Sequence, residues 1–251
     1  MGIDRRQTRA LPGGGVGMAP TLIERLQEKR TDPGARAVLY VALGDSVTQG
    51  CMQFGATEYD RVYHAVCKRE LERRCDGAII NVINSGASGD TIAASRIRWD
   101  RDVFPYKPDL VTILFGHNDA HGGEAGLKGF AAALDELVSR LRAETEAVIV
   151  LITPCMMMRH DNANIAAENR QHVPAFLRLA EEKALAQYVA CIRGYAAKNG
   201  LLLVDAYAMW ERMEENGADI HARLSNGINH PDAAFHIELG EALTAVLLSG
   251  G

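Results

Sequence analysis

Short runs of consecutive apolar residues alternate along this chain with longer segments whose apolar positions recur at helical spacing. The short runs are rich in branched side chains and are bounded by glycine, proline or charged residues, as is typical of strands buried on both faces. The predicted strands cover residues 37–43, 78–83, 110–115, 147–152 and 201–205. The predicted helices cover residues 20–30, 58–74, 91–104, 127–143, 172–198, 206–215 and 233–248.

This alternation predicts an α/β fold in which a five-stranded parallel sheet is covered by helices on both faces, giving three αβα layers. No internal repeat, low-complexity block or long linker divides the chain, and 251 residues suffice for one sizeable core. We therefore predict a single catalytic domain over residues 20–251. Residues 1–19 are rich in arginine and glycine and lack the apolar segment of a secretory signal, so we expect a flexible leader there.

Composition narrows the classes of partner and compartment. The formal net charge of -5 argues against nucleic acid or an anionic membrane as partner, because both require basic surface. No apolar stretch approaches the length of a membrane span. The five cysteines are odd in number and scattered, which is typical of reduced thiols in a cytoplasmic protein. No pattern in the sequence indicates an oligomeric state.

Polar, glycine-rich segments follow the first three predicted strands, and a fourth precedes the last helix. These segments are Gly44-Asp45-Ser46, residues 84–91, residues 116–119 and residues 226–231. In a doubly wound sheet the carboxyl ends of the strands face one crevice, so we expect the four segments to meet. Within the second segment we expect Gly86 to serve the loop through a positive φ.

The four segments contain the groups that acyl transfer requires. A serine hydroxyl needs a nearby base to act as a nucleophile, and His230 can take its proton and return it to the leaving group. The oxyanion that forms needs preorganised donors, which Gly89 can supply through its backbone N–H and Asn118 through its side-chain amide. Ser46 can add its own N–H. Taken singly, Ser46 would more simply cap a helix and Asn118 a turn.

Order and spacing of these segments resemble the four sequence blocks of the SGNH/GDSL hydrolases, from about residue 37 to residue 248. The blocks are Gly44-Asp45-Ser46, Gly89 within residues 84–91, Gly116-His117-Asn118-Asp119 and His230-Pro231. The resemblance implies hydrolysis of carboxylic esters without a cofactor or metal, with Ser46 as nucleophile and His230 as base. It implies an oxyanion hole formed by the Ser46 N–H, Gly89 and Asn118, and a parallel sheet of flavodoxin-like order.

One position departs from the family pattern. The family has an aspartate three residues before the histidine, and here that position is Gly227, preceded by Asn226. Such an aspartate holds the tautomer of the histidine and stabilises the imidazolium. Three alternatives remain: Asn226 orients His230 without charge, a backbone carbonyl does so, or a distant acid such as Asp205 or Asp232 reaches the ring. We favour a Ser–His dyad with neutral orientation, and assign that role to Asn226.

The substrate is expected to be a small-molecule or carbohydrate ester with a short acyl group such as acetate, because no interfacial helix with a basic face is evident. A lysophospholipase or thioesterase is the alternative. The Gly227 departure favours a second alternative, a flavodoxin-like binding protein without activity. A third is a metal-dependent hydrolase built on His117, Asp119 and His121. The run 156–158 consists of methionines that either line an acyl pocket or are simply buried.

Overall fold

The computed structural model describes residues 22–52 and 56–249, so the predicted leader at 1–19 lies outside the described residues. The centre of the fold is a five-stranded parallel sheet with the strand order β2-β1-β3-β4-β5. The strands are β1 Val38–Gly44, β2 Ile80–Gly86, β3 Leu110–Leu114, β4 Val148–Ile152 and β5 Leu202–Val204. The predicted α/β class, the five parallel strands and their order are confirmed.

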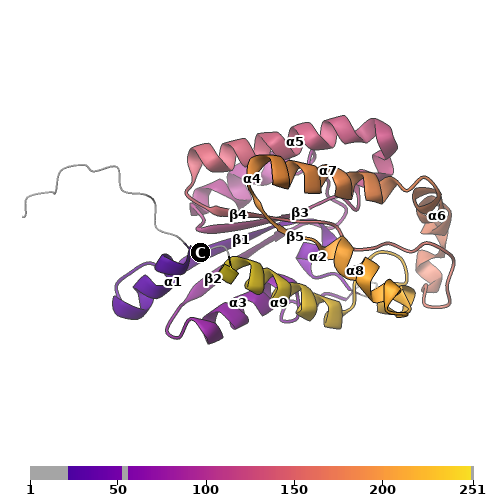
Figure 1. Cartoon of the computed structure of the whole chain (residues 1–251). Helices are drawn as coiled ribbons and strands as arrows, with labels where there is room; N and C mark the ends of the chain where they lie inside the picture. The colour runs from indigo at the N-terminus through magenta and orange to yellow at the C-terminus, as the bar shows by residue number, and fades with distance from the viewer. Residues whose placement is uncertain (1–21, 53–55, 250–251) are drawn as a thin grey trace, which may run out of the picture.

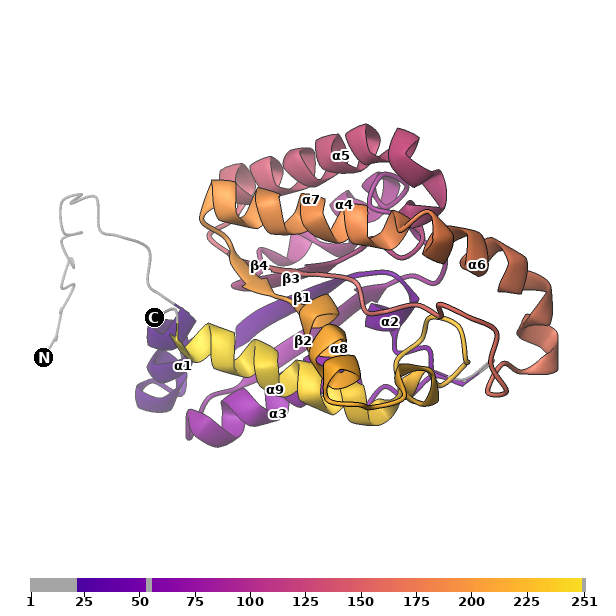
Figure 2. The same cartoon turned by 45° about the vertical axis from the view of Figure 1, so that its right-hand side comes forward.

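Helices cover both faces of the sheet and form the outer layers. Helices α3 and α9 lie side by side on one face, whereas α4, α5 and α7 lie on the other (Figure 1, Figure 2). The α-helices are α1 Leu22–Thr31, α2 Ser46–Gln49, α3 Tyr63–Arg74, α4 Arg96–Asp102, α5 Gly123–Glu144, α6 Val173–Glu181, α7 Ala184–Asn199, α8 Ala206–Glu215 and α9 Ala233–Ser249. Short 3-10 helices span Phe104–Tyr106, Asp119–Gly122, Ala167–His172 and Ile220–Arg223.

The prediction of one long helix over residues 172–198 is wrong, because two helices occupy this segment. Helix α6 ends at Glu181 and α7 begins at Ala184. Between them Lys183 adopts the left-handed conformation with φ 50°, and its N–H donates to the Ala180 carbonyl. The apolar periodicity continues across this break, so the pattern alone does not reveal it.

The register of β1 places the ends of three strands next to one another. Gly44, the last residue of β1, pairs with Gly86 on β2 and with Leu114 on β3. The predicted reason for Gly86 is wrong, since its φ is not positive. A β-carbon at Gly86 would instead lie 2.1 Å from the backbone nitrogen of Gln49. Glycine is therefore required because the end of β2 closely approaches the turn that follows β1.

Candidate active site

Ser46 lies on a tight turn between β1 and the short helix α2. A β-carbon at Gly44 would lie 2.5 Å from the Leu114 carbonyl, so only glycine allows β1 and β3 to end this close together. Asp45 is fully buried and caps α2, because its Oδ1 accepts the Val47 N–H at 2.9 Å. Ser46 is the first residue of α2 and is 5% exposed. The buried aspartate thus fixes the backbone on which the serine is presented.

His230 reaches Ser46 from the loop that precedes α9. Its Nε2 lies 3.0 Å from the Ser46 Oγ, and its Nδ1 lies 3.1 Å from the Met52 carbonyl oxygen. A carbonyl only accepts, so Nδ1 carries the proton and the lone pair of Nε2 faces the serine hydroxyl. Burial lowers the pKa of His230 below its ordinary value, although the Met52 carbonyl and the charge of Asp45 act in the opposite direction. The ring is therefore neutral at neutral pH and able to accept a proton.

The partner of the His230 ring is a backbone carbonyl rather than the Asn226 side chain. The Asn226 Oδ1 accepts the backbone N–H groups of Ile228, Asn229 and His230 at 2.9–3.0 Å. Its amide nitrogen donates to the Asn229 Oδ1 at 2.9 Å. Asn226 is itself buried. It holds the loop that carries His230, while Met52 orients the imidazole.

The position of the missing aspartate is sterically closed to a side chain. Gly227 has φ 74°, and a β-carbon there would lie 2.6 Å from the Ile165 backbone nitrogen. The two distant acids have other partners: Asp205 pairs with Arg193 and caps α8, and Asp232 pairs with Arg223. Among the residues that the structure describes, no carboxylate hydrogen-bonds to the His230 ring.

The two residues predicted to stabilise an oxyanion lie on neighbouring loops after β2 and β3. The Asn118 amide nitrogen donates one proton to the carbonyl of Asp90, at 2.9 Å, which leaves its second proton for another acceptor. Gly89 precedes Asp90, has φ 77°, and its N–H has no acceptor in the part of the chain that the structure describes. The Gly89 loop is bound to the serine turn, since the Ser88 N–H donates to the Gln49 Oε1 at 2.7 Å.

One buried and one half-buried charged residue hold these loops, and sequence reasoning did not identify either role. Arg98 on α4 binds the Asp90 carboxylate at 2.7 Å and the carbonyl oxygens of Ser85 and Gly44, so it joins the ends of β1 and β2 to the Gly89 loop. The carboxylate of Asp119 accepts the N–H groups of Ile92 and Gly116 at 3.1 and 3.0 Å. Burial raises the pKa of Asp119 to about 6. A buried arginine has no periodic sequence signal, and its role emerges only from the folded contacts.

The histidines of the H-x-x-x-H pair do not converge on a common point. His117 bonds to Asp45 and to the Cys155 carbonyl, whereas His121 packs edge-on against Phe176 with ring centroids 5.3 Å apart. Within residues 22–52 and 56–249, no group of three histidine, cysteine, aspartate or glutamate side chains is placed to hold a metal ion. No helix in the same ranges is both long and apolar enough to span a membrane.

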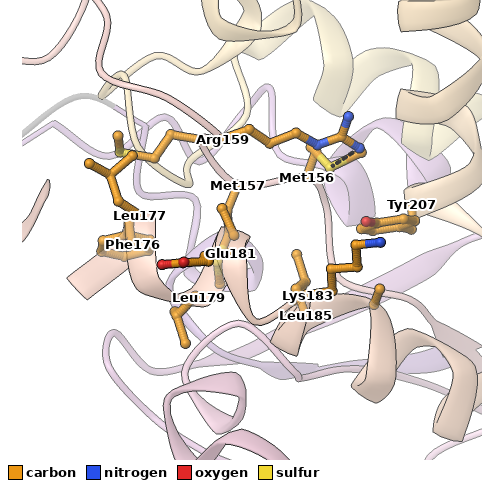
Figure 3. A pocket seen from close by; sticks show the side chains of 13 residues that line it. Met156, Met157, Arg159, Phe176, Leu177, Leu179, Glu181, Lys183, Leu185 and Tyr207 are labelled. Atoms are coloured by element: carbon orange, nitrogen blue, oxygen red, sulfur yellow. Dashed lines mark hydrogen bonds between the residues drawn. The ribbon is translucent and has the colours of Figure 1, made fainter. Parts of the chain in front are cut away.

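A cavity of about 520 Å³ lies beside the segment that follows β4 (Figure 3). Its walls are the three methionines at 156–158 together with apolar side chains of α6 and α7, and Lys183 and Tyr207 lie at one end of it. The methionines are buried, as one of the two readings expects, and they also line this cavity, whereas an acyl pocket at this position stays a prediction. Neither Ser46 nor His230 lines the cavity. The backbone of the methionine segment also contacts the loop that carries His230 (residues 226–231), because the Met158 N–H donates to the Ile228 carbonyl.

Comparison with known proteins places this arrangement in a family. An acetylxylan esterase from Geobacillus stearothermophilus is 28% identical over 171 residues, 65% of this chain and 70% of the relative. The isoamyl acetate-hydrolyzing esterase 1 homolog of Bos taurus is 29% identical over 203 residues, 74% of this chain and 72% of the relative.

Solved structures show the same fold. The acetylxylan esterase structure from Geobacillus stearothermophilus superposes with a TM-score of 0.63 at 24% identity, covering 84% of this chain and 94% of the other. A lipase/acylhydrolase from Enterococcus faecalis gives a TM-score of 0.62 at 22% identity, covering 83% and 94%. The model of the GDSL-like lipase/acylhydrolase family matches residues 42–236, which include Ser46, Gly89, Asn118 and His230. The chain belongs to the GDSL-like lipase/acylhydrolase family.

Proposed function

We propose that the chain hydrolyses carboxylic esters through an acyl-enzyme formed on Ser46. The observation that carries this proposal is the 3.0 Å contact between the Ser46 Oγ and the His230 Nε2, on a ring whose other nitrogen donates to a backbone carbonyl. That tautomer leaves Nε2 free to take the hydroxyl proton. Membership of a lipase/acylhydrolase family supports the same reaction class.

In the first half-reaction His230 removes the proton from Ser46 as Oγ attacks the ester carbonyl carbon. The oxyanion accepts hydrogen bonds from the N–H groups of Ser46 and Gly89 and from the free amide proton of Asn118. The His230 imidazolium then donates its Nε2 proton to the leaving alcohol. The Met52 carbonyl holds the ring in place throughout, because its bond to Nδ1–H persists in both protonation states.

In the second half-reaction water replaces the alcohol. His230 takes a proton from this water, whose oxygen attacks the acyl carbon and forms a second tetrahedral intermediate. Collapse of that intermediate breaks the bond to the Ser46 Oγ, which regains the proton from His230, and releases the acid. Every proton transfer uses the same nitrogen, so the dyad completes the cycle without a cofactor.

We further propose a short acyl group, with acetate first. The two relatives described above are, by name, an acetylxylan esterase and an isoamyl acetate-hydrolyzing esterase 1 homolog, so both names refer to an acetate ester. Their alcohol components differ, a polysaccharide in one and a small branched alcohol in the other. The acetyl group is therefore the part of the substrate that both names have in common.

A fluorophosphonate probe tests the nucleophile directly. Wild-type protein is expected to be labelled and to cleave p-nitrophenyl acetate, whereas Ser46→Ala does neither. Absence of both labelling and cleavage in folded wild-type protein would favour a binding protein without activity. A series of p-nitrophenyl esters then tests the acyl preference. We expect kcat/KM to fall as the acyl chain lengthens, and a maximum at long chains would instead indicate a lipase-type substrate.

A further inference from the structure

His117 is a buried histidine with an oxygen atom at each ring nitrogen. It follows Gly116 in the loop after β3 and is 1% exposed. Its Nδ1 lies 3.2 Å from the Asp45 Oδ2, and its Nε2 lies 3.1 Å from the Cys155 backbone oxygen. It is neither the base nor an oxyanion donor, so the proposed mechanism leaves it without a role.

The two partners determine the protons on this ring. The Cys155 carbonyl can only accept, so Nε2 carries a proton. If the ring were neutral, the lone pair of Nδ1 would then face the Asp45 carboxylate at hydrogen-bonding distance, where both atoms are acceptors. A second proton on Nδ1 removes this conflict and creates a charge-assisted bond between two buried groups. The resulting pair is an imidazolium and a carboxylate.

We propose that His117 is a positioning residue, present as an imidazolium. It connects the turn that carries Ser46 (residues 44–47) to the loop that carries His230 (residues 226–231). This inference rests on the proposed function of Ser46 and His230. It assigns His117 the task of fixing where those two residues stand relative to each other, although it touches neither substrate nor the reacting atoms.

On one side of His117, hydrogen bonds lead to the nucleophile. Asp45 receives the His117 Nδ1–H on Oδ2 and the Val47 N–H on Oδ1. The carboxylate therefore joins the histidine to the first turn of α2, which begins at Ser46. Asp45 is fully buried, so water does not compete for either bond.

On the other side, hydrogen bonds lead to the base. His117 binds the Cys155 carbonyl, and three residues later the Met158 N–H donates to the Ile228 carbonyl at 2.7 Å. Ile228 and His230 both donate their N–H groups to the Asn226 side chain. This series of hydrogen bonds runs from the turn at Ser46 to the loop at His230, and these two residues are hydrogen-bonded to each other. Displacement of one loop is therefore transmitted to the other.

His117 also opposes the effect of Asp45 on the pKa of His230. Burial is the main influence on the pKa of His230 and lowers it; Asp45 raises this pKa and His117 lowers it. On α9, His236 is fully buried against Tyr63, and burial lowers its pKa to about 3, so it adds no charge near neutral pH. Removal of the His117 charge alone would thus leave a buried carboxylate acting on His230 without compensation.

The protonation state of His117 can be measured without turnover. In ring-nitrogen NMR of the wild-type protein, we expect both nitrogens of His117 to be protonated, because each faces an oxygen acceptor. In Asp45→Asn the amide keeps both bonds, accepting from Val47 and donating to the His117 Nδ1, so we expect a neutral ring protonated at Nε2 only. A neutral His117 in the wild type would overturn the proposal and show that Asp45 holds the proton. This readout stands even if the chain cleaves no ester.

Kinetics test the positioning role. We expect His117→Gln to lower kcat on the order of ten- to a hundred-fold with little change in KM, since small displacements of reacting groups have effects of this size. We also expect the acid limb of kcat/KM to move to higher pH, because the Asp45 charge is then uncompensated. The double variant Asp45→Asn/His117→Gln should return the acid limb to its wild-type position.

A matched control separates positioning from general destabilisation. His221 is also buried, with 4% of its surface exposed, and its Nε2 accepts the Arg159 N–H at 3.0 Å. We expect His221→Gln to lower the melting temperature without moving the acid limb. If His117→Gln behaves in the same way, with an unchanged acid limb and kcat, the histidine is only a structural core residue and the proposal fails.

Discussion

Replacement of Asn226 by alanine tests what holds the base in place. The side chain of Asn226 accepts three backbone N–H groups in the loop that ends at His230, and it is 8% exposed. Loss of a partner for a buried N–H costs about 1–3 kcal/mol. The Ile228 N–H is buried and the other two are part-buried, so at the lower end of that range the three orphaned groups would cost at most about 3 kcal/mol. For a domain of this size each kcal/mol lowers Tm by about 2–4 °C. We therefore expect Asn226→Ala to lower Tm by at most about 6–12 °C.

The same change should also slow the reaction, because His230 depends on this loop for its distance to Ser46. A misplacement of about 1 Å can reduce the rate on the order of a hundred-fold. We expect a lower kcat with p-nitrophenyl acetate and a nearly unchanged KM. In Asn226→Asp a carboxylate oxygen can accept the same three N–H groups, so this variant should recover most of the lost Tm.

Asp232→Ala is the control that separates loop support from direct charge on the imidazole. Asp232 pairs with Arg223 and accepts the Phe235 N–H at 2.7 Å, so its loss should cost about 1 kcal/mol as a helix cap. We expect its kcat to remain at the wild-type level. A kcat as low as that of Ser46→Ala would show that an acid acts on His230 and would refute the neutral orientation. Unchanged Tm and kcat in Asn226→Ala would refute the loop argument.

Four other outcomes follow from the structure. Asn118→Ala should lower kcat about 10²- to 10³-fold in steady-state assays, as loss of one oxyanion donor does; an effect on KM alone would contradict that role. The pH profile of kcat/KM should retain activity below the ordinary histidine pKa of 6.5, and activity should fall only as the pH drops through the lowered pKa of His230. Gly227→Asp should lower Tm without raising kcat, because the residue would require a positive φ in a site closed by backbone. Burial lowers the pKa values of His64 and His236 to about 4 and about 3, so below pH 6.5 these two side chains bind more protons in the unfolded chain than in the folded one; in urea unfolding their contribution to stability should be complete above that pH and should be lost progressively from there toward pH 3.

Sequence pattern predicted the sheet well because buried parallel strands leave a direct signal. β3 is buried at every position, and its apolar run is visible without any structure. The break between α6 and α7 left no such signal, since one left-handed residue, Lys183, interrupts a periodicity that resumes beyond it. The loop glycines were recognisable as necessary, but the reason for Gly86 was a close approach between segments distant in sequence.

The residues of the candidate site likewise fall into those that leave a signal in the sequence and those that do not. Ser46, His230, Gly89 and Asn118 could be proposed from the sequence because their chemistry depends on residue type and each stands at a strand end or before a helix. The support of the site could not be found in this manner. Arg98 acts through carbonyl oxygens of strands far from it in sequence, and its neighbours are known only once the sheet has formed.

The Met52 carbonyl orients His230, and as a backbone group it does not depend on which amino acid occupies position 52. Any residue at position 52 presents the same oxygen, so substitution there leaves the acceptor in place, whereas a change in chain length between Ser46 and Met52 would remove it. The Ser46 carbonyl accepts the N–H groups of Gly50 and Cys51, so the serine itself sets the path of the backbone up to that oxygen. One short stretch of chain thereby carries both the proposed nucleophile, Ser46, and the carbonyl that orients its proposed base, His230. We therefore expect activity to survive substitution of the side chain at position 52 and to be lost on insertion or deletion within residues 47–51.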